Sequence, residues 1–346
     1  MQVTDRNSHS SSLNTHLFQN PANYPHFVRR FGAVGNDVPK HVFRSDLGVA
    51  PAQSNPSSSS SSSSSSRKRN KGDKRYIVGD GALRHHKQDY IEIANPFVVS
   101  CNSDDSEKSS IINWDAIEEL ISHGVESSMR VSPKEYPFLF CESHFSSPAD
   151  KAKLLELSFE SFDTPAVYIA SHATLSAFSA GKTTATVVDF GASGISVTPV
   201  IDGYAVHGSR LTTSRGGNWI DENIRFEIED NHKQIAPSVV PWFRLKGSKN
   251  YSDMCCKSFV DMHAQDLFRD IKHWMCFVPY KPMVNDHAAR AKIILDLGIP
   301  PYVLPDGTLL PHSDGLSTVP ERLFVTSRKR NFRATTSGLP NADIDC

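Results

Sequence analysis

The sequence predicts an α/β fold, because short apolar strands alternate along the chain with amphipathic helices. Three strands are predicted from runs of β-branched and aromatic residues at 137–141, 167–169 and 186–188. The helices are predicted from apolar residues that recur at helical spacing. The chain contains no internal repeat of fixed period.

Three helices are expected in the globular part of the chain. The first covers 114–121, with Asn113 as its N-cap and Gly124 as its stop. The second opens at Ser147, which a proline follows. Its expected apolar face consists of Ala152, Leu155, Phe159 and Phe162. A third helix is predicted over 171–180.

Composition narrows the classes of function. The chain of 346 residues carries 37 Lys and Arg against 38 Asp and Glu, so a general affinity for nucleic acids is not expected. No apolar run approaches the ~20 residues that span a bilayer, and the N-terminus lacks the apolar core of a secretory signal. We therefore expect a soluble protein without a membrane partner. Six scattered cysteines favour reduced thiols of the cytosol or nucleus.

A low-complexity stretch interrupts the chain early. Ten consecutive serines occupy 57–66, and such a run cannot bury enough apolar surface to offset its chain entropy. Six of the next nine residues are basic. They form either a solvated linker end or a nuclear localisation signal. The candidate signal residues are Arg67, Lys68, Arg69, Lys71, Lys74 and Arg75.

A glycine-rich hairpin at 187–200 carries the strongest functional signal. Two β-branched runs flank Asp189 and the turn Gly191–Gly194, which predicts a strand, a tight bend and a returning strand. Such a hairpin can present backbone N–H groups to a phosphate, with the aspartate facing a hydrated metal ion. Asp and Gly are also ordinary turn residues, so the hairpin alone leaves both readings open.

Motifs in the same order across residues 76 to about 324 resemble those of the actin family. They are 78–80 (VGD), 112–115 (INWD), 130–137 (RVSPKEYP), 159–168 (FESFDTPAVY), 181–184 (GKTT), 202–205 (DGYA), 269–272 (RDIK), 304–307 (LPDG) and 320–324 (PERLF). A fainter match covers 35–43. In this alignment the hairpin takes the place of the family's second phosphate loop.

The resemblance implies the two-lobed α/β ATPase fold that actin shares with Hsp70 and hexokinase, incomplete here at its C-terminus. The expected segments are a disordered N-terminus at 1–23, a first actin-like lobe at 24–50 and 76–180, a flexible insertion at 51–75, a partial second lobe at 181–325 with its own insertion at 230–262, and a tail at 326–346.

Several residues depart from the family pattern at the phosphate loops. The place of the first loop, 23–29, contains neither glycine nor an acid. In the second loop Ala192 replaces the acid that orders metal-bound water in actin. Ser196 and His172 replace the histidine and glutamine that lie near the attacking water. Because phosphoryl transfer depends on such positioned groups, the resemblance predicts a chain that is not an enzyme.

The remaining residues of the nucleotide site form a vestigial set. The resemblance assigns to it Asp189, Gly191, Ser193 and Lys272. No metal ligands and no catalytic residues are predicted. We expect no cofactor, with ATP and Mg²⁺ as the alternative.

The insertion between the hairpin and the Lys272 helix, together with 277–279 (FVP), resembles the class-four nuclear actin-related proteins. This branch implies a nuclear, non-polymerising subunit of chromatin-remodelling or histone acetyltransferase complexes. The implied partners are nuclear actin and helical scaffold subunits, with histones as a further candidate. The alternative is an ATP-binding actin-like protein of the cytoskeletal type, represented by an incomplete gene model.

Overall fold

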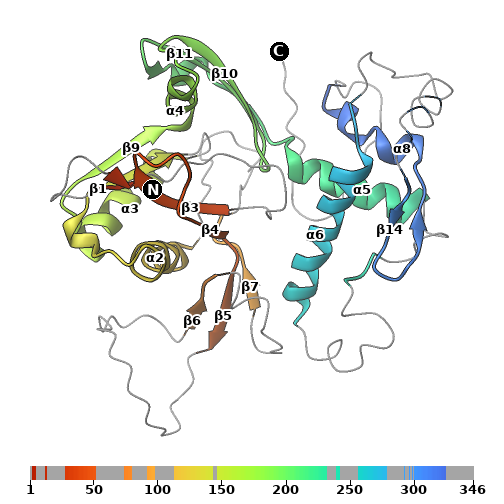
Figure 1. The fold of residues 1–346 in the computed structure, drawn as a ribbon, viewed down its shortest axis with the longest axis horizontal. Helices are drawn as coiled ribbons and strands as arrows, with labels where there is room; N and C mark the ends of the chain where they lie inside the picture. The colour runs from red at the N-terminus through yellow and green to blue at the C-terminus, as the bar shows by residue number, and fades with distance from the viewer. Residues whose placement is uncertain are drawn as a thin grey trace, which may run out of the picture.

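The computed structural model describes residues 2–4, 12–13, 28–51, 74–79, 92–97, 113–142, 146–231, 239–241, 256–278, 292, 296, 298 and 300–324. They form two bodies that lie side by side (Figure 1). We use first lobe for the described residues up to 213 and second lobe for those from 214. The mixture of helices and sheets agrees with the predicted α/β class.

A six-stranded sheet forms the centre of the first lobe, in the order β4-β3-β2-β1-β8-β9. Its strands are β1 (Gln2–Thr4), β2 (Ser12–Leu13), β3 (Val28–Val34), β4 (His41–Arg44), β8 (Phe138–Glu142) and β9 (Val167–Ser171). Strands β8 and β9 are parallel, and the connection between them contains α3 (Pro148–Glu156). The predicted strands at 137–141 and 167–169 are thereby confirmed.

Two short strands lie within 1–23, which we expected to be disordered. Val3 of β1 is the register partner of Leu13 of β2, and β1 also pairs with β3 and β8. The expectation of disorder is wrong for these two segments. The polar composition of 1–23 could not reveal that neighbouring strands would satisfy the backbone groups of β1 and β2.

Helix α2 (Trp114–Ser122) confirms the first predicted helix and its cap, since Asn113 Oδ1 accepts a hydrogen bond from Ala116 N at 3.1 Å. The predicted stop at Gly124 is wrong. The helix continues as a π-helical segment to Met129 and ends at Arg130, whose φ of 57° is left-handed. A Cβ at residue 124 would overlap the ring of Phe31. This glycine therefore permits close packing in the core and does not end the helix.

Helix α3 begins where the sequence predicts, with Ser147 and Asp150 forming a capping box. Its predicted apolar face is only partly correct. Phe162 is buried, but Ala152 and Phe159 are exposed. The chain changes to a π-helical segment over Leu157–Ser161, which shifts the period away from 3.6 residues.

A second sheet follows helix α4 (His172–Ser179). Strands β10 (Ala185–Phe190) and β11 (Ile195–Ile201) form an antiparallel hairpin, and β12 (Tyr204–Ala205) and β13 (Leu211–Thr213) pair with β11. Ala173 and Ala177 of α4 pack against Val200 of β11. The predicted lobe boundary at residue 180 thus falls between α4 and β10, two elements that pack on each other.

A third sheet contains β5 (Leu47–Pro51), β6 (Lys74–Ile77) and β7 (Glu92–Ala94), with β5 in the middle. Lys74 and Arg75, the last two candidate signal residues, are exposed in β6 and pair with β5. These two residues are therefore not part of a flexible insertion, as we had expected. The other candidate signal residues, Arg67, Lys68, Arg69 and Lys71, lie outside the described residues.

The second lobe is built around two long helices, α5 (Gly217–Asn231) and α6 (Lys257–Met275). The smaller elements are β14 (Tyr302–Val303), β15 (Leu309–Leu310), α8 (Asp314–Ser317) and η6 (Val319–Phe324). The short η4 (His207–Ser209) lies between β12 and β13 of the first lobe. Ile224, Ile271 and Met275 belong to its core. Helices α5 and α6 reach into both ends of the predicted insertion at 230–262. The predicted tail at 326–346 lies outside the described residues.

Candidate functional site

The hairpin that the sequence singled out is present. Asp189 and Phe190 at the end of β10 pair with Ser196 and Ile195 at the start of β11. Gly191 N donates a hydrogen bond to Gly194 O at 2.8 Å, which closes the turn. The prediction of strand, bend and returning strand is confirmed.

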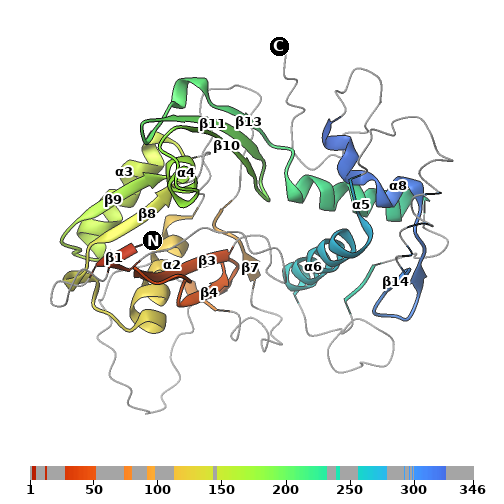
Figure 2. The ribbon, with the colours of Figure 1, turned by 45° about the horizontal axis from the view of Figure 1, so that its top comes forward.

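The turn lies against the first residues of α5 (Figure 2). Gly217 N donates to Gly191 O at 3.0 Å, and Asn218 N donates to Ala192 O at 2.9 Å. Two N–H groups at the start of the helix, a position that commonly binds anions, are therefore taken by carbonyls of the turn.

Gly216 makes this close approach possible. A Cβ at residue 216 would overlap Gly194 N and Gly191 O, and it would lie 2.7 Å from Ala192 O. No side chain fits between these backbone segments. Sequence reasoning missed this role, although the Gly216-Gly217 pair is a signal of close backbone approach.

Lys272 of α6 also reaches the start of α5. Its Nζ lies 2.7 Å from Asp221 Oδ1 and donates a hydrogen bond to Gly217 O at 3.1 Å. Burial raises the pKa of Asp221, and the neighbouring Lys272 ammonium opposes this shift. Lys272 is therefore committed to a buried carboxylate. Asp221 is a partner that sequence reasoning did not find, because one more acid in an amphipathic helix carries no signal.

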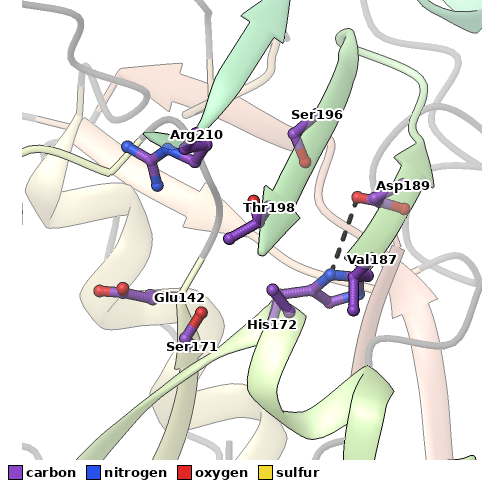
Figure 3. A pocket seen from close by; sticks show the side chains of 9 residues that line it. Glu142, Ser171, His172, Val187, Asp189, Ser196, Thr198 and Arg210 are labelled. Atoms are coloured by element: carbon purple, nitrogen blue, oxygen red, sulfur yellow. Dashed lines mark ion pairs between the residues drawn. The ribbon is translucent and has the colours of Figure 1, made fainter. Parts of the chain in front are cut away.

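Asp189 lies in a small polar recess with His172 (Figure 3). His172 Nδ1 is 3.7 Å from Asp189 Oδ2, and both side chains are about a quarter exposed, at 24% each. Ser196 and Thr198 of β11 also line the recess. Its other residues are Glu142, Ser171, Ala173, Val187 and Arg210.

The four predicted site residues are thus only partly brought together. Gly191 and Lys272 both lie close to Gly217, at the start of α5. Asp189 faces His172 in the recess. Ser193 lies in the turn and is half-buried.

The hairpin turn is a poor match for Mg²⁺. Mg²⁺ favours oxygen ligands in octahedral geometry, and the turn supplies one carboxylate, Asp189, with Ala192 where a second oxygen would be needed. Within the described part of the chain, no group of three or more His, Cys, Asp or Glu side chains is arranged to hold a metal.

None of the helices described there has the length and apolar character needed to cross a membrane.

Comparisons with known proteins agree with this architecture. The family model described as Actin matches residues 26–342. Actin-related protein 4 of Yarrowia lipolytica is 29% identical over 276 residues, covering 75% of this chain and 59% of that protein. Actin-related protein 4 of Debaryomyces hansenii is 26% identical over 282 residues, covering 78% and 54%.

A plant relative shows the same pattern. Actin-related protein 4 of Arabidopsis thaliana is 27% identical over 313 residues, covering 86% of this chain and 67% of that protein. The chain therefore spans little more than half the length of the two fungal relatives and about two-thirds of the plant one. Because the family model matches most of its residues, the chain belongs to the actin family.

Proposed function

We propose that this chain is a non-catalytic, nuclear actin-related protein that serves as a structural subunit of a chromatin-remodelling or histone acetyltransferase complex. The proposal rests on the likeness to relatives named actin-related protein 4 and on the state of the hairpin site. Its partners would be nuclear actin and helical segments of scaffold subunits, with histones as a further candidate. The basic run at 67–75, of which Lys74 and Arg75 are exposed in β6, supports a nuclear location.

The proposal that the protein is not catalytic rests on the contacts that the hairpin turn makes. Its carbonyls accept the N–H groups of Gly217 and Asn218, and Lys272 is paired with Asp221. Electrostatic stabilisation of a transferred phosphoryl group needs free donors and metal ligands in fixed positions. The N–H groups of Gly217 and Asn218 are not free donors, and Ala192 stands where the second acid would be, so the site supplies few of these groups.

An apolar patch supports a role in binding a partner helix. Phe178 at the end of α4 is 50% exposed, Ile201 at the end of β11 is 53% exposed, and Tyr204 of β12 is 80% exposed. Gly203, between the last two, lies against the Phe178 ring. Exposed aromatic and branched side chains of this kind match the apolar face of an amphipathic helix.

Nucleotide binding separates this proposal from the alternative, an ATP-binding actin-like protein. Isothermal titration of the full chain with Mg-ATP is expected to show no saturable heat up to about millimolar ligand, the affinity at which binding energy falls to about 4 kcal/mol. An actin that binds ATP, measured in the same buffer, is the positive control. Micromolar affinity would contradict the proposal that the nucleotide site is only vestigial, and would favour the alternative.

Capture from nuclear extract tests the scaffold role. The immobilised full chain is expected to retain subunits of a remodelling or acetyltransferase complex. Tyr204→Ser combined with Phe178→Ser should reduce this capture at least tenfold, because each removes an exposed apolar anchor. Val303→Ser is the matched control, since Val303 is 59% exposed on the second lobe, and it should leave capture unchanged. Recovery of no such subunit would count against the proposal.

A further inference from the structure

Helix α6 of the second lobe lies next to β7 of the first lobe, far along the chain from it (Figures 1 and 2), and its Asp266 pairs with Arg44 at the end of β4. Ile93 N of β7 donates a hydrogen bond to Ser258 Oγ of α6 at 2.8 Å. The Ile93 side chain packs against Phe259 and Met262 on the same helix. This apolar contact is small, so the polar groups beside it matter for how firmly the lobes are joined.

Arg44 lies at the centre of these polar groups. Its guanidinium holds the Asp266 carboxylate with two hydrogen bonds, from Nη1 to Oδ2 at 2.9 Å and from Nη2 to Oδ1 at 3.3 Å. Its Nε donates to Asp46 Oδ2 at 3.2 Å, within the first lobe. The Arg44 side chain is only 12% exposed. A planar guanidinium that grips a carboxylate at both oxygens fixes orientation as well as distance.

Further groups hold both ends of this contact in place. Asn95 Nδ2 donates to Asp46 Oδ1 at 2.9 Å on the first lobe. Arg269 Nη1 donates to Asp266 Oδ1 at 3.2 Å on α6. Two arginines thus face two aspartates, so the charges balance in a region that is shielded from water. Removing one residue of a buried ion pair is costly, because the remaining charge is left without its partner.

We propose that Arg44 and Asp266 form a clasp that holds the two lobes together across 222 residues of chain. The clasp makes the relative position of the lobes a property of the chain itself. It is independent of the proposed partners and of the hairpin site, so it can fail while the proposed function stands.

Hydrogen exchange of the full chain tests the clasp, because the Ile93 amide is protected by a bond that crosses between the lobes. Arg44→Gln and Asp266→Asn are each expected to speed exchange in 92–97 at least tenfold and to leave β8 unchanged. The double variant should exchange no faster than the quicker single variant, because its two sites share one interaction. Arg322→Gln is the matched control, since Arg322 pairs with Glu227 inside the second lobe.

Unchanged exchange in 92–97, or single effects that multiply in the double variant, would overturn the clasp. A variant that unfolds would accelerate exchange in β8 as well. In that case Arg44→Lys distinguishes the clasp from general destabilisation, because lysine keeps the positive charge but cannot hold both carboxylate oxygens of Asp266. It is expected to speed exchange in 92–97 about threefold with β8 still protected, and no change there would overturn the proposal.

Discussion

Replacing Gly216 with alanine is expected to lower the free energy of unfolding by about 3 kcal/mol. The added Cβ would overlap backbone atoms of the hairpin turn, and these atoms cannot move aside as a flexible side chain could. Separating the turn from α5 would also break the hydrogen bonds from Gly217 N to Gly191 O and from Asn218 N to Ala192 O. Urea unfolding measures the loss.

Gly208→Ala is the matched control for this substitution. A Cβ at residue 208 meets no atom within 4 Å, and the glycine does not need a left-handed φ. Its effect should stay within about 0.5 kcal/mol, the usual range for a surface change. If Gly216→Ala were equally mild, the hairpin turn would not be seated on α5 as described.

Replacing Lys272 with methionine is expected to destabilise the protein by about 3 kcal/mol, because it leaves the buried Asp221 carboxylate without its cation. Asp221 is 6% exposed, and burial already raises its pKa. Without Lys272 that pKa should rise further, so the loss should be greatest near neutral pH and shrink as pH falls and Asp221 takes up a proton.

The double variant Lys272→Met with Asp221→Asn should recover part of this stability, since neither charge is then left alone. Lys153→Met provides the control, because Lys153 and Glu156 form a surface pair with both side chains more than 40% exposed (44% and 47%). Its effect should be close to zero. Equal losses in the two lysine variants, measured by thermal unfolding at neutral pH, would contradict the buried ion pair.

The sequence was most informative where local chemistry decides the structure. Asn113 and Ser147 cap helices where their side chains and spacing predict. The β-branched runs beside Asp189 form the hairpin strands because side-chain shape favours extended backbone there. These features depend on residues within a few positions of each other, so the amino-acid sequence alone is enough to predict them.

The failures have a common cause in distant packing. The sequence predicts Gly124 as a helix stop, but the glycine is needed because the ring of Phe31, on strand β3, packs against it. The sequence predicts Phe159 as a core residue, but it lies in a π-helical segment and is exposed. Composition likewise predicted disorder for segments that join the central sheet as β1 and β2.

The candidate site shows the same division. By itself, the sequence determined the α/β class, the likeness to the actin family, and the hairpin at Asp189 with Ala192 in place of a second acid. Only the tertiary structure decided that the turn carbonyls bind α5, that Lys272 pairs with Asp221, and that Arg44 joins the lobes through Asp266. The physical reason is that these contacts form between elements far apart in the chain, where neither spacing nor composition indicates which groups will meet.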